Sequence, residues 1–225
     1  MTSYNSADIP ALLSPTGGEV NPAIFVFAHQ DDETLTFGAE VIVHKAAGRY
    51  VIGYCATDGR SSSARQLTGL SVTDFVKARN LELMSAASDL GFDELHFLGM
   101  QDGSLSNWQT ADITDMLYRR WPTASFKVPW EGDSNADHAA IGHAFRAVKN
   151  VNPTADIRFY IKPEDRSRVA SYRTSSLVGS PYADQLAVAC AEYQRVDHDN
   201  GRYGIGYLSV PFDFDNFQPI STFVL

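Results

Sequence analysis

The sequence predicts an α/β fold, in which a Rossmann-like, mostly parallel sheet carries helices on both of its faces. Short apolar runs rich in Val, Ile and Phe alternate along the chain with segments whose apolar residues recur at helical spacing. Repeated alternation of this kind is typical of parallel strands joined by crossover helices. The 225 residues contain no internal repeat and no linker-like stretch. We therefore expect a single domain over 1–225, long enough to build an ample core.

The first half of the chain supplies two strands and two helices. An uninterrupted apolar run predicts a buried strand over 23–28, and a second run predicts one over 50–56. A helical pattern follows each strand, over 34–47 and over 73–90, and both patterns stop at a glycine, where helices commonly end. In the second helix, Thr73 is placed to cap the first turn.

The second half continues the alternation. Further strands are expected over 94–98, 124–128 and 156–161, and helices are expected between them over 108–120 and 137–149. The last of these helices has one apolar face at i, i+3, i+4 and i+7 spacing, formed by Ile141, Ala144, Phe145 and Val148.

Three stretches fall outside this alternation. Residues 57–72 are rich in Gly and Ser and form a loop too long for a simple connection, so we expect it to be functional or mobile. Residues 1–20 are expected as an N-terminal extension, and 200–225 as an irregular tail or short strands. Cys55 in a strand and Cys190 on the apolar stripe of a late helix are expected to be buried and unpaired.

The composition narrows the class of protein. A net charge of −9 argues against a general nucleic-acid or anionic-membrane surface, which requires a basic patch. The start of the chain lacks the basic and apolar regions of a signal peptide, and no run of about 18 apolar residues is present. We therefore expect no transmembrane segment and a cytoplasmic location. Both glycine-rich nucleotide fingerprints are missing, which argues against a nucleotide-binding module.

The run from Ala28 to Glu33, AHQDDE, is the most informative feature of the chain. It lies at a strand-to-helix turn, at the carboxyl end of the first predicted strand, where open α/β sheets place their ligands. Its adjacent carboxylates would repel one another unless a cation held them, although carboxylates at a helix start also act as caps. His29 and Asp32 are three residues apart across this turn, and a histidine with a carboxylate suits zinc.

A catalytic zinc needs a third protein ligand and one open position. His138 is the best candidate, because it begins a predicted helix at the same carboxyl edge and lies one turn before Ile141. His143 lies too far around that helix to share an ion with it. Of the other histidines, His44 is expected at the surface, and His198 could reach the site from the tail.

Short motifs continue after this run and end at Gln194. They are Thr57–Gly59, Arg79–Glu82, Leu90–Gly91, Phe97–Gly99, Asp102–Gly103, Asp137–Ala140 and Ala189–Gln194. Together with AHQDDE, they resemble the ordered motifs of the PIG-L/LmbE-like family of zinc-dependent de-N-acetylases, which includes GlcNAc-phosphatidylinositol de-N-acetylase. The resemblance implies a single LmbE-like domain that acts as a metal-dependent N-deacetylase.

The resemblance also implies roles for individual residues. It implies one zinc ion per chain, bound by His29, Asp32 and His138, with other divalent metals left open. It implies that Asp31 is the general base that takes the proton of the attacking water.

Two positions depart from the family pattern. Gln30 replaces the usual proline, which removes no ligand. Asn135 stands where many members have a histidine that assists the oxyanion. Because an amide donates a hydrogen bond but cannot transfer a proton, either Asn135 performs a weaker version of that role or another group, such as His198, supplies it.

The substrate class implied by the resemblance is an N-acylated amino sugar or glycoside. Asp102 is expected to face the pocket and to bind sugar hydroxyls. Arg60 and Arg65, in the long loop, could bind a phosphate or carboxylate of the substrate, although solvated loop charges are an equal alternative. Arg79 and Glu82 are expected to form an ion pair on a helix face.

The leading hypothesis is therefore a zinc hydrolase that removes an N-acetyl or other N-acyl group from an amino-sugar-containing small molecule. One alternative is a metal hydrolase of another amide or ester bond. Another is a non-catalytic carbohydrate-binding protein with the same fold, although the intact Asp31 and metal ligands favour catalysis. Whether the chain forms a homo-oligomer stays open.

Overall fold

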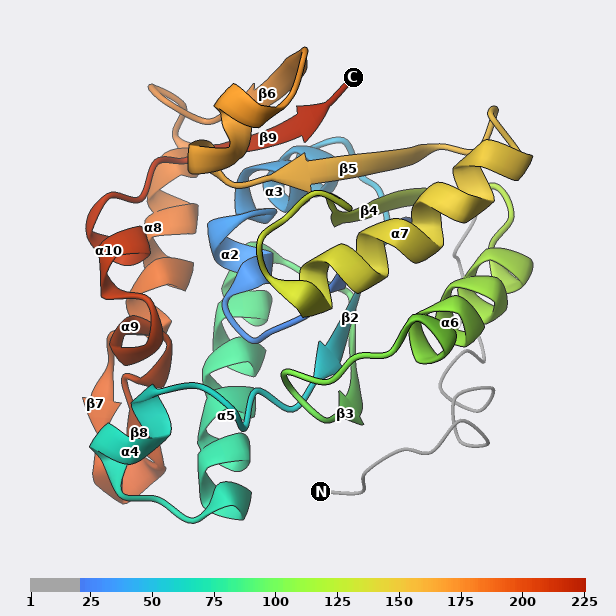
Figure 1. Cartoon of the computed structure of the whole chain (residues 1–225). Coiled ribbons are helices and arrows are strands. Elements are labelled where there is room, and N and C mark those ends of the chain that lie inside the picture. Colours follow the sequence, from blue (N-terminus) through green and yellow to red (C-terminus); the bar gives the residue numbers. More distant parts are fainter. Residues whose placement is uncertain (1–20) are drawn as a thin grey trace.

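The computed structural model describes residues 21–225, so the expected extension over 1–20 lies outside the described residues. The strands of its main sheet are β1 (Ala23–Phe27), β2 (Val51–Thr57), β3 (Glu94–Met100), β4 (Ser125–Pro129), β5 (Ile157–Ile161), β6 (Tyr172–Ser176) and β9 (Ile220–Val224). Their order is β3-β2-β1-β4-β5-β9-β6 (Figure 1). The strands from β3 to β5 are parallel, and β9 runs antiparallel to β5 and β6. The predicted α/β class with a mostly parallel sheet is confirmed.

Helices cover both faces of the sheet. The helices are α2 (Asp32–Leu35), α3 (Gly38–Ala46), α4 (Ala64–Thr68), α5 (Val72–Leu90), α6 (Asn107–Arg120), α7 (Ala136–Val151), α8 (Tyr182–Glu192), α9 (Ile205–Ser209) and α10 (Pro211–Asp215). Helices α6 and α7 pack on one face, and α3, α5 and α8 pack on the other. Short 3₁₀ turns follow β5 (η1, Pro163–Arg168) and the strand β7 (Val196–Asp197), which pairs with β8 (Arg202–Tyr203).

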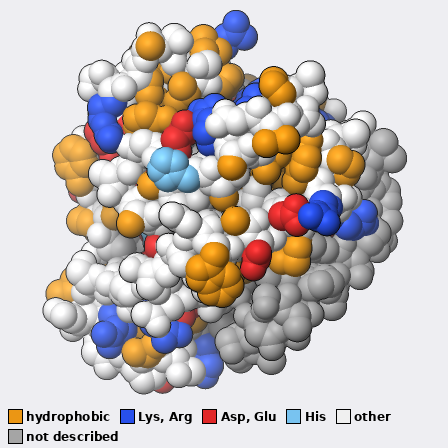
Figure 2. Space-filling view, turned by 45° about the vertical axis from the view of Figure 1, so that its right-hand side comes forward, with side chains coloured by type: hydrophobic (Ala, Val, Ile, Leu, Met, Phe, Trp, Pro, Cys, Tyr) orange, Lys and Arg blue, Asp and Glu red, His pale blue; other side chains and the backbone are white. Residues whose placement is uncertain are grey.

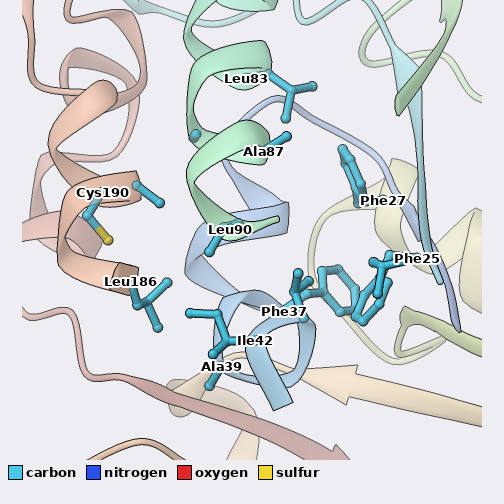
Figure 3. Packing of buried hydrophobic residues seen from close by; sticks show 14 of the residues in the cluster. Phe25, Phe27, Phe37, Ala39, Ile42, Leu83, Ala87, Leu90, Leu186 and Cys190 are labelled. Atoms are coloured by element: carbon cyan, nitrogen blue, oxygen red, sulfur yellow. The ribbon is translucent and has the colours of Figure 1, made fainter. Parts of the chain in front are cut away.

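The side chains of β1 alternate between the two cores. Ile24 and Val26 belong to the core under α6 and α7, whereas Phe25 and Phe27 belong to the core under α3, α5 and α8. Figure 3 shows Phe25 close to Phe37, side chains of α3 and α5 further along the same core, and Leu186 and Cys190 of α8 at its other end. Because both faces are covered, a central strand can be apolar at every position, and this is why the run in the sequence is uninterrupted.

The long predicted elements are confirmed, with ends shifted by at most two residues. The first predicted helix, over 34–47, is wrong as a single element, because the chain breaks between α2 and α3. At the break Phe37 turns inward and packs on Phe25 and Tyr160, with ring centroids 5.9 and 5.1 Å apart. Cys55 and Cys190 are buried and unpaired, as expected.

The C-terminal part of the chain is more regular than the sequence suggested. Residues 200–225 contain the short strands β8 and β9, in line with one of the two expected alternatives, and also α9 and α10, which the sequence did not predict; β9 inserts between β5 and β6. The sequence of β9 does not indicate a buried strand, because Ser221 and Thr222 are polar although both are buried. The expected loop over 57–72 contains α4.

His44 is buried, so its expected place at the surface is wrong. Its ring packs against Phe25, with centroids 6.0 Å apart. Its Nε2 lies 3.2 Å from a carboxylate oxygen of Glu40, one turn earlier on α3. The helix is covered on this side by β9, which the sequence pattern did not reveal.

Within residues 21–225, no helix combines the length and the apolar character that crossing a bilayer requires. On the face of the molecule shown in Figure 2, Lys and Arg side chains are interspersed with acidic and apolar ones.

One glycine of α7 is required by close packing against the loop that precedes the helix. A Cβ at Gly142 would lie 2.4 Å from the backbone nitrogen of Glu131 and 2.7 Å from the carbonyl carbon of Trp130. We expect Gly142→Ala to push α7 away from this loop and to lower the Tm by about 2–12 °C. Asn150→Ala, at an exposed position of the same helix, is the control, and differential scanning calorimetry is the measurement. An unchanged Tm would show that the loop yields freely.

Candidate metal centre and pocket

Two strand ends bring the predicted metal ligands together. His29 follows β1 and Asp32 begins α2, whereas His138 lies in the first turn of α7, which follows β4. Because β1 and β4 are parallel neighbours, their carboxyl ends meet at one edge of the sheet. The three side chains therefore come from two distant segments of the chain. Asp32 and His138, the nearest two residues across these segments, are 106 positions apart in the sequence (138 − 32).

The converging donor atoms have the spacing of a metal site. His29 Nδ1 lies 3.1 Å from His138 Nε2, and His138 Nε2 lies 3.1 Å from Asp32 Oδ2. His29 Nδ1 and Asp32 Oδ2 are 3.7 Å apart. Ligands of a tetrahedral zinc ion, with bonds of about 2.0–2.1 Å, lie about 3.3 Å from one another. The donor set and its spacing thus fit the ion that the sequence suggested.

The other ring nitrogens of the two histidines face carboxylates. His138 Nδ1 lies 2.9 Å from Asp133 Oδ2. His29 Nε2 lies 3.2 Å from Asp102 Oδ1 and 3.4 Å from Asp137 Oδ2. A proton held on each of these nitrogens leaves His29 Nδ1 and His138 Nε2 with free lone pairs, and carboxylate partners of this kind orient metal-binding histidines.

The cluster of carboxylates favours a positive charge at this place. Burial lowers the pKa of His29, but hydrogen bonds to Asp102 and Asp137, together with the charges of Asp32 and Asp31, raise it overall to about 10. The same environment that holds a proton so tightly on an imidazole would stabilise a bound cation.

Asp31 lies beside His29, Asp32 and His138, here called the triad, but has a different partner. Its Oδ2 accepts a hydrogen bond of 3.1 Å from Nη2 of Arg79, which also donates to the carbonyl of Gln30. The backbone of Asp31 has a φ of 140°, a conformation that L side chains rarely adopt. Burial raises the pKa of Asp31 to about 6, although the charge of Arg79 lowers it. The arrangement holds a carboxylate of raised basicity next to the predicted metal ligands.

Arg79 and Glu82 do not form the expected ion pair on an exposed helix face. Both are buried, with 3% and 0% of their surface exposed. Arg79 reaches the loops after β1 and β2, and Glu82 accepts hydrogen bonds from the backbone N–H groups of Ile205 and Gly206, at 2.8 and 3.0 Å. The segment containing α9 covers this side of α5, a tertiary contact that helical spacing does not report.

A cavity of about 400 Å³ opens onto the triad. Asp31, Asn135 and Asp102 line it together with the three predicted ligands. The side-chain oxygen of Asn135 accepts hydrogen bonds from the N–H groups of Asp137 and His138, at 2.9 and 3.3 Å, so Asn135 also caps α7. Asp102 accepts a hydrogen bond of 2.8 Å from the N–H of Ser61 in addition to its contact with His29.

Three other predicted residues lie elsewhere. Among the described residues, the cavity lining does not include Arg60, Arg65 or His198. The Nε of Arg60 donates to Asp58 at 2.6 Å, and the Nε of Arg65 donates to the carbonyl of Arg60 at 3.2 Å. The ring of His198 stacks on Tyr203, with centroids 4.8 Å apart.

Sequence reasoning missed two residues of this site, one that lines the cavity and one that contacts a predicted ligand. Lys162 lines the cavity directly after β5, and Asp133 contacts His138 from the loop after β4. A position directly after a predicted parallel strand was the signal that could have found Lys162, because such positions share the ligand-binding edge of the sheet.

Comparisons with solved structures give the fold. The N,N'-diacetylchitobiose deacetylase from Pyrococcus horikoshii is 17% identical, with a TM-score of 0.61 over 90% of this chain and 82% of that chain. A zinc-inhibited form of the teicoplanin deacetylase Orf2 is 14% identical, with a TM-score of 0.64 over 90% and 97%. The 4-carboxy-2-hydroxymuconate hydratase GalB from Pseudomonas putida KT2440 is 15% identical, with a TM-score of 0.64 over 91% and 95%. The chain has the LmbE-like fold of these proteins.

Comparisons of sequence give the family. No curated protein sequence matches the chain. The family model of GlcNAc-PI de-N-acetylase (PIG-L) matches residues 24–149, which is more than half of the chain and includes the three residues of the triad. The chain therefore belongs to the PIG-L family, a family of deacetylases with the LmbE-like fold.

Proposed function

We propose that this protein is a zinc-dependent hydrolase that removes an N-acetyl, or another N-acyl, group from an amino-sugar-containing small molecule. The observation that carries the proposal is the pairing of two features in one cavity. Three donor atoms of His29, Asp32 and His138 lie 3.1–3.7 Å apart, and the carboxylate of Asp31 stands beside them in the same lining. Membership of a deacetylase family supports the reaction class.

In this proposal His29, Asp32 and His138 hold the ion, one per chain. A bound zinc ion lowers the pKa of a water molecule toward ~7 and polarises the carbonyl of the substrate amide. The carboxylates of Asp133 and Asp102 keep the two imidazoles in the protonation state and orientation that binding requires.

Asp31 carries the proton through the reaction. Its carboxylate accepts a proton from the attacking water as the water oxygen bonds to the amide carbon. The protonated Asp31 then delivers that proton to the amide nitrogen as the carbon–nitrogen bond breaks, which yields a carboxylic acid and a free amine. Arg79 fixes the position of Asp31 through the 3.1 Å contact between Nη2 and Oδ2.

The remaining predicted site residues have narrower proposed roles. Because the side-chain oxygen of Asn135 caps α7, its NH₂ group is the part that can donate to the developing oxyanion. Asp102 lines the cavity and is proposed to accept a sugar hydroxyl, in addition to orienting His29. Arg60 and Arg65 are proposed to act only on a substituent that extends out of the cavity, since neither lines it.

A hydratase is the second candidate, because GalB resembles this chain as closely in fold as the teicoplanin deacetylase does. In that reaction the water would add to a carbon–carbon double bond and no amine would be released. A carbohydrate-binding role without catalysis is the third candidate, and the buried, positioned Asp31 argues against it.

The direct test is acetate release from a panel of N-acetylated amino sugars by the zinc-loaded protein. We expect release from at least one of them, loss of release after chelation, and recovery after zinc is returned. Hydration of an unsaturated carboxylate with no amide cleaved would favour the hydratase. Sugar binding with neither reaction would favour the binding protein.

Removing the partner of one metal ligand tests the metal site separately from the chemistry. We expect Asp133→Asn to lower zinc affinity about 10–100-fold, because a neutral amide polarises His138 less than a carboxylate does. Competition with a fluorescent chelator measures the affinity without any substrate. Asp115→Asn, an exposed carboxylate of α6, is the control. Equal affinities in the two variants would contradict the proposed role of Asp133.

A further inference from the structure

One side of the cavity is apolar and comes from the end of the chain. Val210, Phe212, Phe217 and Ile220, here called the C-terminal wall, line the same cavity as Asp31 and the triad. They belong to α10, to the residues that flank it and to the first position of β9. Figure 1 shows this segment in red, between α9 and β9.

One residue of the C-terminal wall, Phe212, is not needed to anchor its own segment. Phe214 anchors it, since it is 6% exposed and packs on Tyr193 and Tyr207, with ring centroids 5.6 and 6.2 Å apart, and Val210 and Phe217 pack against the same core. Phe212, two residues earlier, is 74% exposed although it lines the cavity. When an apolar group covers an exposed aromatic ring of this kind, apolar surface leaves water and the binding free energy becomes more favourable.

The charges around the cavity limit what can bind there. Asp31, Asp32, Asp102, Glu164 and Asp213 supply carboxylates to its lining. Of the lysines and arginines in the described chain, the lining includes Arg79, which is paired with Asp31, and Lys162. Burial lowers the pKa of Lys162, but nearby carboxylates, Asp32 first, raise it overall, so Lys162 keeps its positive charge. Away from the proposed metal ion, the carboxylates of the lining outnumber these two cations, which disfavours a phosphate or carboxylate on the substrate there.

The wall and the metal centre belong to different parts of the chain. The family model covers 24–149, which contains the triad, whereas the four residues of the wall lie after that range. The triad therefore lies within the part of the chain that the family model matches, and the wall lies beyond that part.

We propose that the C-terminal wall is a subsite for an uncharged apolar substituent of the substrate, carried either by the sugar as an aglycone or by the amide as a longer acyl chain. This inference rests on the proposed function for its catalytic readout. The cavity of about 400 Å³ is in the range of about 300–1,000 Å³ that suits drug-sized ligands, so it has room for such a substituent beside the sugar.

Matched substrates test the subsite on the zinc-loaded full chain. The methyl glycoside of N-acetylglucosamine is the reference. Its hexyl glycoside extends the aglycone, and the methyl glycoside of N-hexanoylglucosamine extends the acyl group. We expect one extended compound to have a kcat/KM at least about tenfold above the reference, mainly through a lower KM, because several methylenes are buried. The compound that gains identifies the source of the apolar group.

Two variants connect that preference to the wall. We expect Phe212→Ala to reduce the ratio of kcat/KM between the favoured extended compound and the reference to less than about threefold. Trp108→Ala, which removes another exposed aromatic outside the cavity lining, should leave the preference unchanged. Calorimetric binding of uncharged hexyl glucoside, which has no amide to cleave, gives a readout independent of catalysis.

The outcomes separate the two proposals. If no amide is cleaved but hexyl glucoside binds and Phe212→Ala weakens it, the subsite stands and the deacetylase fails. If all three substrates are cleaved equally well, or if Phe212→Ala and Trp108→Ala behave alike, the deacetylase stands and the subsite is overturned. If no amide is cleaved and hexyl glucoside does not bind, both fail.

Discussion

His29→Ala and His138→Ala are each expected to lose bound metal and amide hydrolysis together. Each removes one of the three proposed protein ligands, and the two that remain would not hold zinc in a site that needs three. The zinc content measured by elemental analysis should fall from about one ion per chain to near none. Hydrolysis should fall by more than the ~100-fold expected when only an outer partner of a ligand is lost.

His143→Ala is the matched control for this experiment. His143 lies on α7, as His138 does, but it is exposed and is not part of the triad. It should keep both metal and activity. Thermal unfolding of each variant separates metal loss from general unfolding. A His138→Ala protein that is folded and still holds a full equivalent of zinc would contradict the proposed triad.

Asp31→Asn is expected to keep the metal and to lose about 10²–10⁴-fold in kcat. The amide preserves the size of the side chain and can still accept a hydrogen bond from Arg79, but it cannot take a proton from water. KM and zinc content should change little, because Asp31 is not part of the triad.

Measuring both zinc content and kcat shows which role Asp31 has. Metal loss in Asp31→Asn would place Asp31 among the ligands, and a normal kcat would remove it from the mechanism. Arg79→Lys tests the positioning of the carboxylate. It keeps the charge but loses the fork that joins Asp31 to the carbonyls of Gln30 and Gly59.

The sequence by itself determined the layers of the fold and the three residues proposed to bind a metal. Apolar runs of strand length and helical periodicity are local properties, so they located β1 to β5 and the long helices to within two residues. The ligands were accessible for the same reason. His29 and Asp32 lie in one turn, and His138 begins the helix after a parallel strand, so strand order alone brings them to one edge.

Tertiary structure decided what surrounds the ligands. The contacts of His29 with Asp102, of Asp31 with Arg79 and of Glu82 with Gly206 join segments 48–124 residues apart. The insertion of β9 and the place of the C-terminal wall also depend on how distant segments pack. Such contacts leave no periodic trace in a sequence, because a side chain's partner is set by the packing of whole elements. The sequence therefore determined the elements and the residues of the proposed ion site, whereas only the packed chain decided which groups orient those residues and what shape of ligand can enter.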